Sequence, residues 1–143
     1  MMIMTEKYKV LGKYIKDMSS ETADAETYIF VKDYISKYQL SIDINSKAIK
    51  NKMIEINTIM KFEDKEERKK KSYFEINYAT IIKVNDEVKE KKELEKIILC
   101  DVQITIYPDI EKSFLDLLHN SGYPGVKFEK KIDFEKLYNQ KFN

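Results

Sequence analysis

Three segments of the chain alternate apolar and polar side chains, and this alternation restricts the fold more than any other feature. The segments are residues 38–44, 53–62 and 72–84. Successive side chains of a β-strand point to opposite faces of its sheet, so each segment is predicted to be a strand with one buried face. One apolar face and short polar connections are typical of an antiparallel sheet.

A first strand is predicted at residues 6–17, where the alternation is less regular and Gly12 is a candidate bulge. Residues 18–36 have no clear period. Ser20 could cap a short helix, whereas the apolar run 28–31 resembles a strand or a crossover loop, and we interpret the whole region as a connection. Residues 63–71 are all charged, which predicts a solvated hairpin connection.

The second half of the chain has helical spacing. Residues 87–96 are mostly Lys and Glu, while the β-branched stretch 98–107 is also compatible with a strand. After Pro108, which is expected to break or kink a helix, an apolar stripe predicts an amphipathic helix that ends at Gly122. Asp133 is predicted to cap a last helix. Strands followed by helices indicate one α+β domain over residues 1–143, with a four-stranded antiparallel sheet and C-terminal helices packed on one face.

The composition limits the class of protein. The formal net charge is +1, without the basic excess typical of nucleic-acid-binding proteins. Cys100 is the only cysteine, so neither an internal disulfide nor a zinc site of several thiolates is expected. No apolar run approaches the ~20 residues of a membrane span, and no long apolar leader is visible, so we expect a cytoplasmic protein without membrane insertion.

The sequence marks out no catalytic, cofactor-binding or metal-binding residues, and we predict that the protein is not an enzyme. Its only histidine, His119, is expected to be a solvated residue near a helix end. Cys100 is expected to be a small buried hydrophobe rather than a nucleophile. With three glycines in the chain, phosphate-binding loops are not expected. A carboxylate pair for acid–base catalysis stays open, although no pair stands out.

Four short motifs together resemble the SecB family of export chaperones. In chain order they are Tyr14–Glu21, Ile106-Tyr107-Pro108, Ser121-Gly122-Tyr123-Pro124, and Ile132-Asp133-Phe134 with Leu137-Tyr138. They resemble the end of the family's first strand, a step inside its long helix, the exit of that helix and the start of its last helix. Their order and spacing are similar to those of the family, and the resemblance covers nearly the whole chain.

The resemblance implies a homotetramer, built as a dimer of dimers, that holds unfolded preproteins and passes them to a SecA-like motor. It implies client contacts at Tyr14, Ile29, Phe30 and Tyr34, and motor contacts at Asp17, Glu21 and Glu75. For Ile29, Phe30 and Tyr34, burial in the core or in a subunit interface is the alternative. For the acidic residues, the alternative is ordinary exposed strand ends.

Two features depart from the family, which is strongly acidic and carries a polar or acidic C-terminal tail. This chain is nearly neutral and ends at Phe142-Asn143. The departures leave a second hypothesis, a dedicated chaperone of a single partner such as an antitoxin. A third hypothesis, from another class, is a small-ligand binding module or small enzyme.

Overall fold

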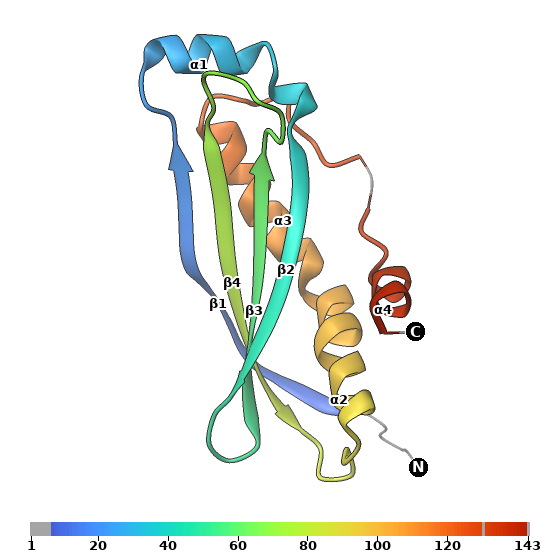
Figure 1. Cartoon of the computed structure of the whole chain (residues 1–143). Coiled ribbons are helices and arrows are strands. Elements are labelled where there is room, and N and C mark those ends of the chain that lie inside the picture. The colour runs from blue at the N-terminus through green and yellow to red at the C-terminus, as the bar shows by residue number, and fades with distance from the viewer. Residues whose placement is uncertain (1–6, 130, 143) are drawn as a thin grey trace.

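The computed structural model describes residues 7–129 and 131–142, and it is an antiparallel sheet with helices packed against it (Figure 1). The elements are β1 (Tyr8–Glu21), α1 (Ala25–Lys32), the 3-10 helix η1 (Ile35–Lys37), β2 (Gln39–Ala48), β3 (Met53–Glu63), β4 (Tyr73–Val84), α2 (Lys91–Lys96), the π-helix η2 (Ile97–Asp101), α3 (Val102–Asn120) and α4 (Phe134–Phe142). The predicted α+β class, a four-stranded antiparallel sheet with C-terminal helices, is confirmed, although α1 and η1 lie between β1 and β2.

The strand order in the sheet is β1-β4-β3-β2, and every neighbouring pair is antiparallel. The register places even-numbered residues of β2, β3 and β4 opposite one another, as in the pairs Ile56↔Thr80 and Met60↔Ile76. These even-numbered side chains are the apolar ones that the alternation predicted. A slip of one residue would move them all to the other face, so the alternation itself specifies the register.

Helix α3 covers this even-numbered face (Figure 1). Its residues Ile106, Ile110, Phe114 and Leu118 are fully buried, and they belong to the same core as the sheet residues Ile56, Met60, Ile76 and Ile82. Burying one such side chain contributes about 1.5–3 kcal/mol. The predicted amphipathic stripe after Pro108 is therefore the packing surface of the helix.

A buried polar link also connects the helix to the sheet. The Thr58 hydroxyl donates to the Gln103 side-chain oxygen at 2.9 Å, and the Gln103 amide donates to the Ile98 carbonyl at 3.2 Å. That carbonyl lies in η2, the π-helical segment that precedes α3. A buried amide is stable only when its hydrogen bonds are made, so this link favours one position of α3 along β3.

The interpretation of residues 18–36 as a connection was wrong. Strand β1 continues to Glu21, after bulges at the register shifts between Val10 and Gly12 and between Ile15 and Asp17. Helix α1 then begins after Asp24, whose carboxylate accepts the Thr27 N–H at 2.8 Å. The cap is thus Asp24 rather than Ser20. The helical period was hidden because only Thr27 and Val31 of α1 are buried, and Thr27 is polar.

Residues 98–107 are helical, so their strand propensity is overridden by packing against the sheet. Helix α3 also runs through Pro108. Proline removes the hydrogen bond to the carbonyl four residues earlier, here that of Ile104. Pro108 is exposed and the Ile104 side chain is 52% exposed, so the freed carbonyl lies on the solvent side of the helix.

Gly122 ends α3 as predicted. Its φ is +108°, and the Tyr123 and Gly122 N–H groups donate to the Leu118 and His119 carbonyls, which is the Schellman pattern. A Cβ at Gly122 would lie 2.5 Å from Cε1 of Tyr28, whose hydroxyl donates to the Gly122 carbonyl at 2.9 Å. This glycine therefore also joins α1 to the end of α3.

Gly122→Ala is expected to lower the free energy of unfolding by about 2 kcal/mol, because alanine is strained at positive φ and would displace Tyr28. Gly125→Ala is the matched control, since a Cβ there meets nothing within 4 Å. Urea denaturation of both variants measures the difference. Equal stability of the two variants would contradict this explanation.

Candidate functional site

The face of the sheet opposite α3 carries the odd-numbered residues of β2, β3 and β4 together with the side chains of β1 that pair with them. We call it the open face, because the core helix lies on the other side. Tyr73 is 54% exposed there, and Asp43, Lys61 and Lys83 are exposed too. A flat, largely polar sheet face of this kind is available to another macromolecule.

The three predicted motor contacts lie together on the open face. In the β1–β4 register, Asp17 pairs with Asn77, Ser19 with Glu75, and Glu21 with Tyr73. Glu75 is therefore the diagonal neighbour of both Asp17 and Glu21, at about 7–8 Å between backbones. Lys61 of β3 is the register partner of Glu75, and its ammonium lies 3.8 Å from the Glu75 carboxylate. The structure thus brings all three carboxylates to one end of the open face.

Tyr14 lies on the open face, apart from the other predicted client contacts. Its hydroxyl donates to Glu55 at 2.9 Å, and the Lys16 ammonium donates to the same carboxylate at 3.0 Å. The Asn57 amide adds a third donor at 3.2 Å. Together these donors lower the pKa of Glu55 to about 2. The contact between Glu55 and Tyr14 could not be predicted from the sequence, because β4 separates their strands and only the register brings the two side chains together.

Helix α1 crosses one end of the sheet and carries Ile29 and Phe30, with Tyr34 just beyond its end (Figure 1). Ile29 is 63% exposed. The Phe30 and Tyr34 rings, one turn apart, have centroids 4.9 Å from each other. We call these three residues the α1 surface. It is partly apolar and partly exposed, which is the arrangement expected of an adaptable binding surface.

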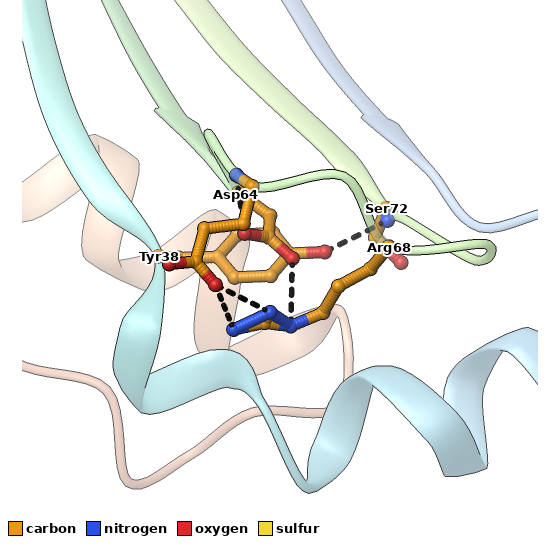
Figure 2. A network of polar contacts seen from close by, with 5 residues as sticks. Tyr38, Asp64, Arg68 and Ser72 are labelled. Atoms are coloured by element: carbon orange, nitrogen blue, oxygen red, sulfur yellow. Dashed lines mark hydrogen bonds and ion pairs between the residues drawn. The ribbon is translucent and has the colours of Figure 1, made fainter.

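The charged connection at 63–71 reaches this surface through Arg68, which Figure 2 shows beside Asp64. The Arg68 guanidinium lies 4.5 Å from the centre of the Tyr34 ring, within the range of a cation–π interaction. Its Nε lies 3.3 Å from the Asp64 carboxylate, and Nη2 lies 2.9 Å from Glu66. Arg68 therefore ties the β3–β4 connection to the aromatic pair.

The prediction that residues 63–71 are simply solvated was therefore wrong in part. The Asp64 side chain is 1% exposed and the Arg68 side chain 13% exposed. Burial of two charges is tolerated because they pair with each other and make further hydrogen bonds, including one from the Glu66 N–H to Asp64. Next to them, the Ser72 N–H donates to the Tyr38 hydroxyl at 3.0 Å (Figure 2). In the sequence, nothing distinguishes Asp64 and Arg68 from their charged neighbours.

Strand β1 is an edge of the sheet and carries a further exposed apolar set. Leu11, Ile15 and Met18 are 46%, 44% and 41% exposed, and Ile104 of α3 is 52% exposed. Helix α3 follows β1 on the even-numbered side, where Tyr8 contacts Thr105 and Lys13 pairs with Asp109. An edge strand with exposed aliphatic side chains is suited to contact with another chain.

Cys100 and His119, the two residues considered for nucleophilic catalysis, lie in surroundings typical of residues with a structural role. Cys100 is buried, as predicted, and burial raises the pKa of its thiol. His119 is half-buried rather than solvated, and its Nε2 lies 2.8 Å from the Val126 carbonyl. Within residues 7–129 and 131–142, no three potential metal ligands of the His, Cys, Asp or Glu type are grouped. No helix in that part of the chain is long and apolar enough to cross a bilayer.

The Glu55 network predicts a specific pH dependence of stability. The folded pKa of about 2 lies below the ordinary value of 4.5, so the unfolded chain binds more protons between these values. The stabilisation from Glu55 is therefore complete above pH 4.5 and is lost as pH falls toward 2. Glu55→Gln should make the free energy of unfolding fall less steeply between pH 5 and pH 3.

Chemical denaturation at several pH values measures this slope, and Glu67→Gln, which removes an exposed carboxylate from the β3–β4 connection, is the control. The control should keep the slope of the unchanged protein. An unchanged slope in Glu55→Gln would show that the carboxylate is not held in its ionised form by Tyr14 and Lys16.

Comparison with known proteins agrees with this geometry. The family model described as preprotein translocase subunit SecB matches residues 4–143. A protein of Pelagibacter ubique that is named for the protein-export protein SecB is 64% identical over 140 residues, which are 98% of this chain and all of the relative. The protein-export protein SecB of Parvibaculum lavamentivorans is 26% identical over 133 residues, covering 93% of this chain and 77% of the relative.

The fold is also similar to that of a SecB-like chaperone of Mycobacterium tuberculosis, solved in complex with a peptide from an antitoxin. The TM-score is 0.64 at 13% identity, and the match covers 87% of this chain and 91% of the other. The family match over nearly the whole chain and the 64% identity decide the assignment. The chain belongs to the SecB family and is a SecB-like chaperone of preprotein export.

Proposed function

We propose that this chaperone holds unfolded preproteins in the cytoplasm at the α1 surface and delivers them to a SecA-type translocation motor that docks on the open face. The observation that carries the proposal is the meeting of Asp17, Glu21 and Glu75 at one end of an uncovered sheet face. The α1 surface and the three carboxylates are separate, so a client held at the α1 surface and a motor can be bound at the same time. Tyr14 is the one predicted client contact on the face that the motor would occupy.

Docking of the motor on the open face is supported by the negative charge of the three carboxylates. Asp17 and Glu21 are exposed, and the Glu75 side chain is 38% exposed with one lysine nearby. Because the carboxylates stand on paired strands, their relative positions are fixed before binding. A cationic surface of the motor would be steered to them, and their spacing would set its orientation.

Client binding is supported by the combination of aliphatic and aromatic groups on the α1 surface. Ile29 offers exposed aliphatic area, while Phe30 and Tyr34 offer the parts of their rings that are left open by each other and by Arg68. Aromatic side chains bury large areas and adapt to different partners, which a chaperone of many sequences needs. Tyr14 stays a predicted client contact. A client would reach it along β1 rather than from the α1 surface.

We assign the exposed apolar residues of β1 and α3 to assembly. An unpaired edge strand flanked by Leu11, Ile15 and Met18 would be covered by β1 of a second copy, with Ile104 at the margin. Two such pairs would give the dimer of dimers that the family resemblance implies. The α1 surface lies outside this contact, at the end of the sheet.

A chaperone dedicated to one partner is the second candidate. The observation that favours it is the net charge of +1 in place of the strongly acidic character expected of the family. The fold neighbour from Mycobacterium tuberculosis binds an antitoxin peptide, so the fold is compatible with a single client. Such a protein would bind one segment and ignore unrelated unfolded chains.

Replacing Asp17, Glu21 and Glu75 together by Ala should weaken binding to a purified SecA-type motor about tenfold or more, because three docking charges are lost. The effect should shrink at high salt, since exposed charges are screened. Calorimetry or biolayer interferometry measures the affinity. The matched control replaces the exposed Asp116, Glu129 and Glu135, which lie on the helical side of the molecule, by Ala.

The control should bind the motor as tightly as the unchanged protein does. If the open-face variant also keeps full affinity, the motor does not dock on these carboxylates. Circular dichroism of both variants checks that the fold is retained.

A further inference from the structure

The charges of the open face are segregated along the strands. Toward α1, the carboxylates are those of Asp17, Glu21, Asp43, Glu63 and Glu75, with Lys61 among them. We call this part the acidic end. At the opposite end, where the β2–β3 turn lies, we call Lys9, Lys47 and Lys83 the lysine end; Glu55 and its partner Lys16 are the other charged residues there. One sheet face thus presents two opposite charges at its two ends.

The lysine end holds like charges against each other. Lys9 and Lys83 are exposed and stand directly opposite in the β1–β4 register, an arrangement that destabilises a sheet. Within the described residues, neither ammonium has a carboxylate at ion-pair distance. The nearby Asp86 forms its ion pair with Lys52 from the β2–β3 turn, and Lys83 acts on it only from a greater distance. A repulsive pair of this kind is favourable when an anionic group binds between its members.

The neighbouring carboxylate does not neutralise this end. Lys47 faces Glu55 in the β2–β3 register, but the Glu55 carboxylate is already held by Lys16 and Tyr14. Beside Lys9 and Lys83 the surface is hollowed by a depression of about 380 Å³. It is lined by Tyr8, Lys9, Lys83, Val84, Asn85 and Asp86. The lysine end therefore offers both positive charge and room for a side chain.

The two ends are far enough apart to act separately. Lys83 and Glu75 lie eight positions apart on β4, which is about 26 Å at roughly 3.3 Å per residue. Even Asp43 and Lys47, four positions apart on β2, are about 13 Å from each other. Both distances exceed the Debye length of about 8 Å at physiological salt, so dissolved ions screen most of the interaction between the two ends. Both still fit under a single protein interface of about 800 Å² per partner.

We propose that the lysine end binds an acidic polypeptide segment of the same motor protein whose cationic surface docks on the acidic end. This inference rests on the proposed function and adds a second contact of opposite charge to it. A protein surface can present both charges at the required spacing. A membrane of anionic lipids or a nucleic acid would meet the carboxylates of the same flat face, so both fit the segregated pattern poorly.

The test is motor binding by Lys9→Glu/Lys83→Glu, with Lys127→Glu/Lys131→Glu as the matched control. Lys127 and Lys131 are exposed on the connection that follows α3. The open-face variant should bind the motor about tenfold more weakly, while the control should stay within about twofold of the unchanged protein. A second variant, Lys9→Gln/Lys83→Gln, removes the repulsion. It should keep or raise the melting temperature and still lose motor affinity, which a purely structural role would not produce.

Full motor affinity of both lysine variants would overturn the inference. If the triple replacement of Asp17, Glu21 and Glu75 still weakened binding in that case, the proposed function would stand without it. Absence of motor binding by the unchanged protein would overturn the two together. Cosedimentation with vesicles containing phosphatidylglycerol provides the last comparison. Lysine-dependent binding to these vesicles, with motor binding unaffected by the lysine variants, would assign the lysine end to lipid and overturn the inference.

Discussion

The packing of α3 on one face of the sheet is the constraint on which the rest of the structure depends. Strands β2, β3 and β4 direct their even-numbered residues toward this helix, and the link from Thr58 to Gln103 favours one position of the helix along β3. A single helical layer covers one face only. The opposite face must therefore be polar enough to stay in water, and it becomes a flat, patterned surface whose side chains are fixed by the strand register.

The open face and the α1 surface, at the end of the sheet, differ in chemical character. The open face carries charges at fixed spacings, which suits a folded partner with a defined surface. The α1 surface carries an exposed isoleucine and two tilted rings in contact with each other, which suits flexible apolar chains. Arg68 joins the β3–β4 connection to the α1 surface, because it covers Tyr34 while it pairs with the buried Asp64. Under the proposed function, the fold therefore separates the surface for a folded partner from the surface for unfolded clients.

The parts of the fold set by local periodicity could be predicted from the sequence. The alternation in 38–44, 53–62 and 72–84 gave the right strands, and Gly122 and Asp133 mark a helix end and a helix start as expected. Helix α1 was missed because its buried side is narrow. The helical state of residues 98–107 depends on packing against the sheet, which β-branched composition alone does not reveal.

For the candidate site too, some residues could be predicted from the sequence and others could not. Strand periodicity placed Glu75 on the outward face of its strand, whereas Asp17 and Glu21 were expected there only from the family resemblance, because residues 18–36 were interpreted as a connection. The partners of Tyr14 and Tyr34 could not be predicted, because Glu55 and Arg68 lie far away in sequence and are joined to them only by the register and by a folded connection. Contacts between distant residues that carry charge leave no periodic trace in a single sequence.

The most direct test of the central claim, that this chain holds unfolded preproteins at the α1 surface, is light scattering of a preprotein diluted from denaturant. We expect the protein to suppress aggregation of two unrelated preproteins at about one chaperone assembly per client chain. Ile29→Asp should weaken the suppression, because it places a charge in the apolar contact. Leu137→Asp, at an exposed leucine of α4, should not. Undiminished aggregation of both preproteins in the presence of the unchanged protein would contradict the account.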